Sequence, residues 1–291
     1  MNLILDEKKI RKGKPVGLPY VGSKKKISKK IVEIIKQNFG TDNTVYDVFG
    51  GGGAITAELI INGLDVVYND LDKTITDMFN RVLHQDREWI KTLIVSRDEF
   101  FRILSKDDKT IDDELKLLVN SFGNNRKSYL YSKDLSDIKY KLAVEILEKE
   151  DTLFGYKKTK QYEKSSYKKI DKNDRLQQLQ QLQQLENIQE LNNYPKTTNE
   201  DYRHFSDIKD SILYLDPPYE NTETSSYKSK IDYQDFYNWV VEMSKNNIVL
   251  LSSYEVSDDR FECVYEFKNA RSTLAGGKSG SRCEKLFMVK L

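Results

Sequence analysis

The segment 44–70 constrains the fold of this chain more than any other. Residues 44–49 are mainly apolar, which is typical of a buried strand, and four glycines follow them directly. Residues 54–63 then have the pattern of a helix that a glycine closes, and residues 65–68 predict a second strand. This order of strand, glycine loop, helix and strand is a βαβ unit, so we predict an α/β fold.

The glycine loop indicates a ligand site but does not identify the ligand. Glycines at a strand–helix turn let the backbone approach a ligand closely. Gly50 and Gly52 fit the first two glycines of a dinucleotide-binding fingerprint, whereas Thr56-Ala57 fit its last position only loosely. Asp70, after the second strand, stands where a carboxylate can bind the two hydroxyls of a ribose. A dinucleotide site therefore stays open on the evidence of this loop alone.

A second motif, Asp216-Pro217-Pro218-Tyr219, follows the apolar run 213–215. Two successive prolines cannot continue a strand ladder, because neither has an N–H to donate. An aspartate, two rigid carbonyls and a tyrosine ring are thus presented at the carboxyl end of a strand, where open α/β sheets bind ligands. The structural alternative is a strand that simply ends in a proline turn.

These four residues are the parts that methyl transfer to an exocyclic amino group needs. The lone pair of the adenine amino group is delocalised into the ring and is a poor nucleophile. Asp216 and the carbonyl of Pro217 can accept its two N–H bonds, and the ring of Tyr219 can stack on the base. The motif therefore favours S-adenosylmethionine over a dinucleotide as the cofactor. Its methyl sulfonium is the electrophile, so we expect no metal.

Composition limits the other functions that the chain could have. A length of 291 residues suffices for an α/β domain with a second, smaller one. No apolar run approaches 18 residues, and the N-terminal apolar run is too short for a signal peptide, so we expect a cytoplasmic protein without a membrane segment. The cysteines and histidines are too few for a disulfide framework or zinc site; they are Cys263, Cys283, His84 and His204.

The composition changes between residues 97 and 196, where charge rises and glycine is scarce. We expect a catalytic domain formed by 1–96 and 197–291, with 97–196 as an inserted domain. Within the insert, residues 112–121 predict a helix and residues 124–129 a polar loop or hairpin.

Basic clusters indicate DNA as the partner, although a solvated lysine-rich surface is the alternative. Residues 1–30 contain ten Lys or Arg and two acids. Residues 155–170 contain six lysines and one glutamate, with three tyrosines among them. Basic clusters with aromatic residues suit a phosphate backbone.

A leucine repeat covers residues 176–191. An apolar residue recurs at every third position, at Leu176, Leu179, Leu182, Leu185, Ile188 and Leu191. A three-residue step on an α-helix turns about 300°, so these side chains would wrap the whole circumference. A 3₁₀ helix would align them, but long 3₁₀ runs are uncommon. A spacer and a packing element both remain open.

The remaining elements are predicted from periodicity and short apolar runs. They are helices over 26–38, 72–94 and 235–245, a strand over 247–253, and a terminal hairpin of 263–267 and 284–291.

Four motifs in this order resemble the Dam-type (D12 class, alpha group) DNA adenine-N6 methyltransferases, including phage-encoded members. They are Tyr20-Val21-Gly22-Ser23-Lys24, Asp47-Val48-Phe49-Gly50-Gly51-Gly52, Asn69-Asp70 and Asp216-Pro217-Pro218-Tyr219. The resemblance covers most of the chain outside 145–200 and implies a Rossmann-like S-adenosylmethionine-dependent methyltransferase sheet with an inserted, mainly helical target-recognition domain. Asp47 and Ser23 depart from it, since many relatives have Glu-Pro and Gly there.

The resemblance also implies roles for individual residues. Catalysis falls to Asp216, Pro217, Pro218 and Tyr219. The cofactor-binding residues are Tyr20 and Lys24 at the methionine end, Asp47, Phe49, Gly50, Gly51 and Gly52 around the methionine and sugar, Asp70 at the ribose, and Asp201 and Tyr202 near the adenine. The DNA-binding residues are Asn124, Asn125, Arg126, Lys127 and Tyr129. Structural alternatives are a surface lysine for Lys24, a helix cap for Asp70, an exposed loop charge for Arg126 and simple packing for Tyr219.

We therefore expect a DNA methyltransferase that modifies adenine N6 in a short duplex sequence by base flipping. The alternatives are a cytosine-N4 methyltransferase and a non-catalytic DNA-binding protein that keeps the fold. Double-stranded DNA is the expected partner, bound by a monomer or by a dimer on DNA. A restriction–modification system, a phage or an orphan role would each suit such an enzyme.

Overall fold

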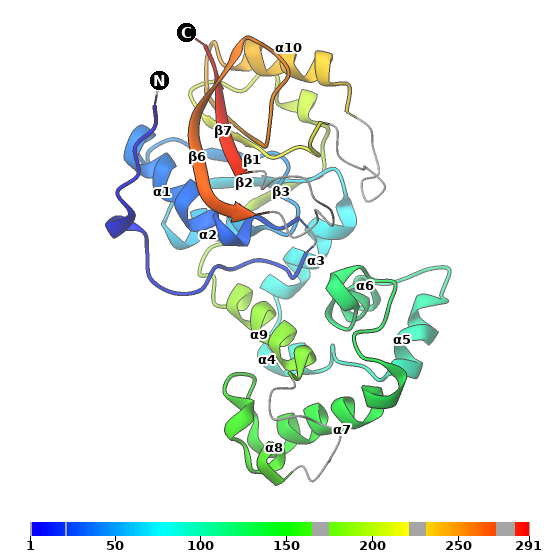
Figure 1. Cartoon of the computed structure of the whole chain (residues 1–291). Helices are drawn as coiled ribbons and strands as arrows, with labels where there is room; N and C mark the ends of the chain where they lie inside the picture. The colour runs from blue at the N-terminus through cyan, green and yellow to red at the C-terminus, as the bar shows by residue number, and fades with distance from the viewer. Residues whose placement is uncertain (1, 21, 165–174, 221–230, 272–282, 291) are drawn as a thin grey trace. The chain divides into compact units, whose positions relative to one another are not determined.

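The computed structural model describes residues 2–20, 22–164, 175–220, 231–271 and 283–290 (Figure 1). The chain forms two compact units. The first, called the sheet unit, comprises Met1–Pro15, Lys24–Thr76 and Asn192–Leu291. The second, called the helical unit, comprises Val16–Ser23 and Asp77–Leu191.

The sheet unit is built on a seven-stranded sheet with the order β3-β2-β1-β4-β5-β7-β6. Its strands are β1 (Val45–Asp47), β2 (Val66–Asn69), β3 (Lys196–Thr198), β4 (Ile212–Leu215), β5 (Ile248–Ser253), β6 (Phe261–Arg271) and β7 (Cys283–Val289). The first five pair in parallel, whereas β7 is antiparallel to both β5 and β6. The predicted Rossmann-like α/β sheet is thereby confirmed, and so is the terminal hairpin.

The strand order reverses between β1 and β4, which places a topological switch point there. The two strands pair with Asp47 opposite Tyr214, and the Val48 N–H continues the ladder by donating to the Tyr214 carbonyl at 3.1 Å. The residues that follow β1 and β4 therefore emerge at the same edge of the sheet. This edge is where an open α/β sheet binds its ligand.

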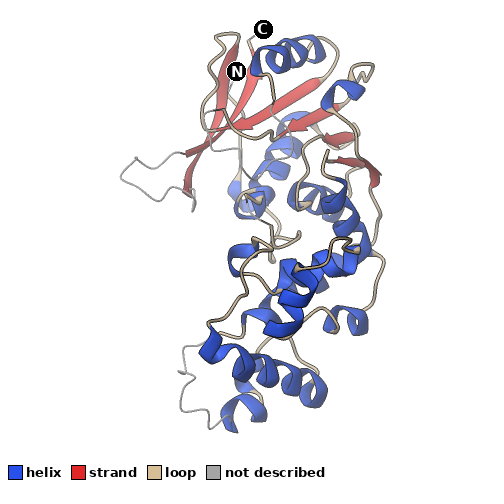
Figure 2. Cartoon of the chain, turned by 90° about the vertical axis from the view of Figure 1, so that its right-hand side faces the viewer, coloured by secondary structure: helices blue, strands red, loops and turns tan. Residues whose placement is uncertain are grey.

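Helices of the sheet unit lie against this sheet (Figure 2, strands red and helices blue). They are α1 (Ser28–Phe39), α2 (Ala54–Ile61) and α10 (Tyr233–Met243), with 3₁₀ turns at Glu7–Lys9, Lys24–Lys26 and Tyr202–Phe205. Asp232 caps α10 by accepting from two backbone N–H groups of its first turn. The apolar side chains of α10 pack with those of β4 and β5 in one core that includes Phe236, Val240 and Leu215.

The helical unit contains no strand among its described residues apart from one isolated bridge between Ser121 and Tyr129. Its helices are α4 (Arg87–Lys91), α5 (Arg97–Leu104), α6 (Ile111–Val119), α7 (Lys133–Glu150), α8 (Lys160–Lys164) and α9 (Gln177–Gln189), with 3₁₀ turns at Phe122–Asn124 and Tyr156–Lys158. Helix α3 (Lys73–Leu83) begins in the sheet unit and continues past Asp77. The single helix expected over 72–94 is two, because Asp86 accepts from the Trp89 N–H and starts α4.

The leucine repeat is an α-helix and a packing element, so neither the spacer nor the 3₁₀ alternative holds. All six of its apolar residues, Leu176, Leu179, Leu182, Leu185, Ile188 and Leu191, are buried. Helix α9 contacts α4, α6 and α7, so apolar partners meet it in more than one direction. A repeat that wraps the helix circumference is what such an enclosed helix requires.

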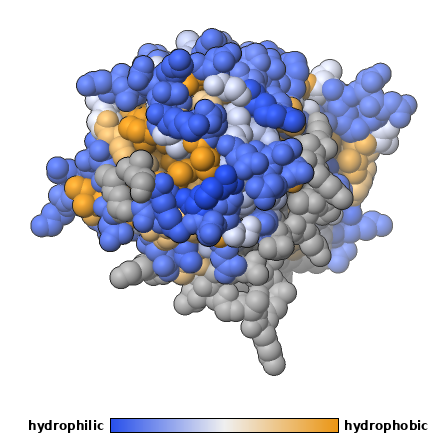
Figure 3. All heavy atoms as spheres, turned by 90° about the horizontal axis from the view of Figure 1, so that it is seen from above, coloured by the Kyte–Doolittle hydropathy of each residue, from blue (hydrophilic) through white to orange (hydrophobic). Residues whose placement is uncertain are grey.

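The surface shown in Figure 3 is mostly hydrophilic, with hydrophobic residues in small separate groups. No helix among the described residues is long and apolar enough to cross a membrane.

Candidate active site

A buried ion pair stands at the carboxyl end of β4. The Lys24 ammonium lies 2.8 Å from Oδ1 of Asp216, and the two side chains are only 11% and 15% exposed. Lys24 also donates to the Tyr219 hydroxyl at 2.5 Å and lies 4.8 Å from the centre of that ring. Asp216 and Tyr219 reach this edge because β4 ends at Leu215 and the two prolines cannot continue its ladder.

Glu284, at the start of β7, completes this cluster, although it belongs to none of the four sequence motifs. Its carboxylate accepts from the Tyr219 hydroxyl and, at 3.0 Å, from the Ser252 hydroxyl. Its Oε1 lies 3.6 Å from the Lys24 ammonium. One signal for it was available in the sequence, since Glu284 stands beside the apolar run 286–289, and a carboxylate that such a strand buries needs a partner.

Burial and charge set the protonation of the cluster. Burial raises the pKa of Asp216 to about 6; Lys24 opposes the rise and Glu284 adds to it. Burial also lowers the pKa of Lys24, but the carboxylates of Asp216 and Glu284 outweigh it and hold that pKa above its usual value. Near neutral pH the site thus holds a cationic lysine beside a mostly ionised Asp216.

Asp47 places a second buried carboxylate at the end of β1. Its Oδ2 accepts from the N–H and the hydroxyl of Thr56, at 3.1 and 2.7 Å. Its Oδ1 is buried and accepts no hydrogen bond from the described part of the chain. Burial raises the pKa of Asp47 to about 7, and the charges of Asp216 and Asp70 act in the same direction. A buried acceptor of this kind favours a ligand that donates a proton or carries positive charge.

The glycine loop is shaped by the residues of β2. A Cβ on Gly50 would lie 2.5 Å from the ring of Tyr68, so packing against this ring requires the glycine there. Gly51 has a φ of 47°, its N–H donates to Oδ2 of Asp70 at 2.9 Å, and its carbonyl accepts from the Tyr68 hydroxyl at 2.6 Å. Asp70 also accepts from the Asp72 N–H at 2.8 Å, just before α3. Asp70 therefore orients the loop as well as the start of the following helix.

Asn69 joins the ends of three strands, a role that its position at a strand end does not reveal in the sequence. Its side-chain amide donates to the carbonyls of Val48 and Glu200, at 2.8 and 3.0 Å. Its oxygen accepts from the Thr198 hydroxyl and the Glu200 N–H, both at 2.8 Å. The residues that follow β1, β2 and β3 are held together by this one side chain, which is 2% exposed.

Three further residues expected at the cofactor form an aromatic and capping group beside the glycine loop. Asp201 accepts from the Arg203 N–H and pairs with its guanidinium at 2.7 Å. The Tyr202 ring packs 5.0 Å from Trp239, and the Phe49 ring lies 6.3 Å from Tyr202. Tyr202 is 8% exposed, so the structure gives it a packing role, and its contact with a cofactor stays a prediction.

Tyr20 and Lys24 fall in different units although only four positions separate them. Tyr20 belongs to the Val16–Ser23 segment of the helical unit, and its carbonyl accepts from the Ser23 N–H at 3.3 Å. Lys24 opens the next segment of the sheet unit, and its ammonium lies on Asp216. The surface-lysine alternative for Lys24 does not hold.

The predicted DNA-binding loop is compact and internally bonded. Oδ1 of Asn125 accepts from the N–H groups of Lys127 and Ser128, at 2.8 and 2.9 Å. Arg126 has a φ of 58° and forms an ion pair of 2.9 Å with Glu114. Asn124 donates to the Leu118 carbonyl at 3.1 Å. Lys127, by contrast, is an exposed cation of the loop.

Tyr129, which the resemblance places among the DNA-binding residues, is buried in the helical unit. It is 6% exposed, and its hydroxyl donates to the Val95 carbonyl at 2.9 Å. It packs with Phe100 and Leu117 in the core of the helical unit. Tyrosine buries its ring when an interior carbonyl can take its O–H, which the sequence does not reveal.

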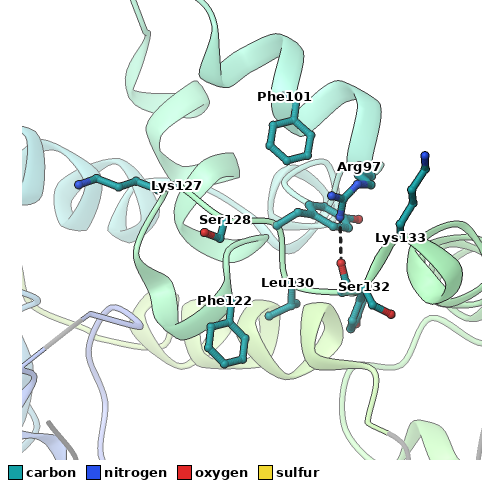
Figure 4. A pocket seen from close by; sticks show the side chains of 10 residues that line it. Arg97, Phe101, Phe122, Lys127, Ser128, Leu130, Ser132 and Lys133 are labelled. Atoms are coloured by element: carbon teal, nitrogen blue, oxygen red, sulfur yellow. Dashed lines mark hydrogen bonds between the residues drawn. The ribbon is translucent and has the colours of Figure 1, made fainter. Parts of the chain in front are cut away.

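A hollow of about 510 Å³ lies next to this loop in the helical unit (Figure 4). Arg97 and Phe101 of α5 line it, with the Arg97 guanidinium 5.0 Å from the Phe101 ring and bonded to the Tyr131 carbonyl at 3.0 Å. Phe122, which is 65% exposed, and Lys133 line it from the loop and from the start of α7. Cations and exposed aromatic rings thus surround one hollow, which suits a nucleic-acid backbone and its bases.

The lysine-rich segment 155–170 is described only in part. Lys157 and Lys158 lie exposed on a 3₁₀ turn, whereas the ring of Tyr156 is buried. Lys168 and Lys169 lie outside the described residues.

The sheet order, with its reversed strand β7, and the Asp216 cluster at the switch point agree with the methyltransferase sheet that the sequence motifs imply. Residues 20–240, more than half of the chain, match the model of the D12 class N6 adenine-specific DNA methyltransferases, and the chain belongs to this family. No curated protein matches the sequence.

Two solved structures resemble the chain at a distance. One is a "putative methylase" of Haemophilus influenzae, with 8% identity over 91% of this chain and 98% of the other. The second is a "putative methyltransferase" of Escherichia coli, with 10% identity over 100% and 98%. Both have a TM-score of 0.34, which is too low to support an argument about this chain.

The family implies S-adenosylmethionine as the methyl donor, and the residues of the sheet unit fit it. Oδ1 of Asp47, to which none of the described residues donates, suits the ammonium of its methionine portion. Asp70 follows β2, where a carboxylate can meet ribose hydroxyls. Among the described residues, no group of three or more His, Cys, Asp and Glu side chains could hold a metal ion.

Proposed function

We propose that this methyltransferase transfers the methyl group of S-adenosylmethionine to N6 of adenine in a short duplex DNA sequence, after the base has left the helix. The observation that carries the proposal is the shielded Asp216 carboxylate at the end of β4, with the Tyr219 ring three residues on. We also propose that the sheet unit is the catalytic domain and the helical unit the target-recognition domain, acting in the cytoplasm as a monomer or as a dimer on DNA.

Asp216 and Pro217 act on the amino group of the extruded base. Their oxygens accept its two N–H bonds, which returns electron density to the nitrogen. As the nitrogen attacks, it becomes cationic and its N–H groups become stronger donors. The carboxylate then interacts more strongly than with the neutral base, and this difference lowers the barrier. After transfer the nitrogen loses one proton, for which the Asp216 carboxylate is a suitable acceptor.

The cofactor supplies a methyl group on a sulfonium, which is already an electrophile when bound. The residues of the chain therefore need to bind, orient and exclude water rather than to activate the donor. Asp47 would hold the ammonium, Asp70 the ribose, and Gly51 keeps the loop in a conformation that leaves room for the ligand. Tyr219 would stack on the target base, an interaction worth about 1–3 kcal/mol.

The helical unit would supply DNA affinity. Lys127, Lys133, Lys157 and Lys158 are exposed cations that can contact phosphates. The hollow between α5 and the 122–133 segment places aromatic rings beside two of them. Such contacts would offset the few kcal/mol that extrusion of a base costs.

Nucleoside analysis of methylated DNA tests the proposal. The purified protein is incubated with S-adenosylmethionine carrying an isotopic methyl label and with unmethylated duplex DNA, which is then digested for mass spectrometry. We expect labelled N6-methyladenine. Labelled N4-methylcytosine would move the activity to cytosine, and no label at all, with DNA bound, would indicate a non-catalytic protein that keeps the fold.

A further inference from the structure

Lys24 faces two carboxylates, and only one of them belongs to the family motif. Its ammonium lies 2.8 Å from Oδ1 of Asp216 and 3.6 Å from Oε1 of Glu284. Glu284 is 6% exposed, and the Lys24 side chain 11%. A single cation thus serves two shielded anions, and a small movement of its flexible stem changes which of them it contacts.

The target amino group competes with Lys24 for Asp216. In the structure Lys24 contacts the Asp216 carboxylate directly, and this contact must be loosened or shared before the carboxylate can accept an N–H of the substrate. A buried ammonium that lost its anion without a replacement would be strongly unfavourable. Glu284 is placed to receive it, because the two already lie within ion-pair distance.

We propose that Glu284 is a positioning residue of this active site, which holds Lys24 and the Tyr219 hydroxyl and receives the Lys24 ammonium when the target amino group bonds to Asp216. This inference rests on the proposed function. In the free protein Glu284 orients Tyr219 by accepting from its hydroxyl, and Ser252 fixes Glu284 by donating to it at 3.0 Å. In the substrate complex its negative charge stabilises the displaced lysine.

The variant Glu284→Gln separates the charge of this residue from its shape. Glutamine keeps a carbonyl that can accept from Ser252 and Tyr219, so a purely structural role would be preserved. It cannot neutralise Lys24. We expect kcat to fall by about tenfold or more, with the KM for S-adenosylmethionine changed by less than about twofold. Glu284→Asp, which keeps the charge on a shorter stem, should recover part of the loss.

The pH profile gives a readout that a structural role would not move. Asp216 is faced by Lys24, Glu284 and Tyr219, and the carboxylate of Asp47 and the neutral phenol of Tyr214 also lie close to it. Removing the negative charge of Glu284 should lower the pKa of Asp216, because that charge raises it. The acid limb of kcat/KM should therefore move to lower pH in Glu284→Gln and stay in place in Glu284→Asp.

The matched control is Glu266→Gln on β6, a glutamate whose loss should leave both readouts unchanged because it lies outside the cluster. If Glu284→Gln does not fold, Ser252→Ala removes the hydroxyl that donates to Glu284 and should lower kcat by about twofold to fivefold. A folded Glu284→Gln variant with wild-type kcat and an unchanged acid limb would overturn the role of Glu284. It would leave the proposed function standing, since the wild-type protein would still methylate DNA.

A wild-type protein that does not methylate DNA would instead overturn the proposed function. The role of Glu284 is then decided by unfolding with urea at pH 5 and pH 8. Because Glu284 raises the pKa of Asp216, the folded wild-type protein should lose stability as pH rises from 5 to 8. This loss should be larger than that of Glu284→Gln over the same range. Equal losses would show that Glu284 does not act on this carboxylate.

Discussion

Asp70 accepts a 2.9 Å hydrogen bond from the backbone N–H of Gly51, and so ties the end of β2 to the loop that follows β1. Its second oxygen accepts from the Asp72 N–H at 2.8 Å, before α3 begins at Lys73. The carboxylate that we propose binds a ribose therefore already organises the glycine loop. Loss of this side chain should affect affinity through both routes.

We expect Asp70→Ala to weaken S-adenosylmethionine binding more than Asp70→Asn does. Alanine removes hydrogen bonds to a charged group, worth about 1.5–3 kcal/mol, and also releases Gly51. Asparagine has one acceptor oxygen, so it can keep the bond from the Gly51 N–H while it loses the ribose contact and the bond from the Asp72 N–H. Isothermal calorimetry measures both variants, with the exposed Asp42→Asn as control. Unchanged affinity in folded Asp70→Ala would contradict the placement of the cofactor.

The parts of the site that the sequence predicted are those fixed by strand ends. A buried strand that runs into glycines or into two prolines must release its next residues at the sheet edge, so the positions of Asp47, Asp70 and Asp216 follow from local pattern. The sequence does not reveal why position 50 must be a glycine. Gly50 is required by the ring of Tyr68, whose position depends on how two strands pair.

Other features depend on contacts between distant segments, which local patterns do not report. Glu284 enters the site because β7 runs antiparallel beside β5. Tyr129 is buried because the Val95 carbonyl, 34 positions away, accepts its O–H. The leucine repeat is a helix because three other helices enclose it. In each case tertiary packing decides between alternatives that the local sequence leaves equal.

A second prediction concerns pH and the buried carboxylate of Asp47. Its pKa in the folded protein, about 7, lies above the ordinary value of 3.8, so ionisation is disfavoured by folding. The folded state therefore loses stability from this group as pH rises from about 4 to about 7. Asp47→Asn removes the ionisation. The free energy of unfolding of the variant, measured relative to that of the wild type, should therefore be about 1–4 kcal/mol higher at pH 8 than at pH 4.5. Urea unfolding of both proteins at the two pH values tests this. A stability difference between variant and wild type that is the same at both pH values would contradict the prediction.

Gln178 is the subject of a third prediction, since its side chain links three parts of the helical unit. Its amide donates to the Val95 carbonyl at 3.0 Å and to Oδ1 of Asn120 at 2.6 Å, and it is fully buried. Gln178→Leu removes these two buried hydrogen bonds, while the Val95 carbonyl still accepts from Tyr129 and Oδ1 of Asn120 from the Val95 N–H. The loss should destabilise the protein by about 1–3 kcal/mol. Gln181→Leu, on the half-buried part of the same helix, is the control and should change stability by less. Thermal unfolding of both variants would decide, and equal effects would remove the special role of Gln178.

The cations beside the hollow of the helical unit should govern the salt dependence of DNA binding. Removing one phosphate contact lowers the slope of log affinity against log salt by about 0.9. The double variant Lys127→Gln/Lys133→Gln should therefore flatten the slope by up to about 1.8 and leave the affinity for S-adenosylmethionine alone. Fluorescence anisotropy at several salt concentrations measures this. The matched control replaces two exposed lysines of the sheet unit, as Lys209→Gln/Lys245→Gln. Equal salt slopes in the two double variants would show that Lys127 and Lys133 lie on an ordinary solvated surface.

The central prediction is that Asp216→Ala abolishes methylation while cofactor and DNA still bind. The carboxylate contributes mainly in the transition state, when the amino nitrogen becomes cationic, so its loss should reduce kcat far more than KM. Asp216→Asn keeps an acceptor without the charge and should retain trace activity at most.

The environment of Asp216 adds a pH signature to this loss. Because burial raises its pKa to about 6, protonation should remove activity as pH falls through that value, and kcat/KM of the wild-type protein should show an acid limb there. Tyr219→Phe should lower kcat more than the loss of a single hydrogen bond would, since the missing hydroxyl accepts from Lys24 and also donates to Glu284. Tyr219→Ala should be severe, because stacking is lost as well. Single-turnover assays with labelled cofactor measure all of these variants; full activity in Asp216→Ala would end the proposed mechanism.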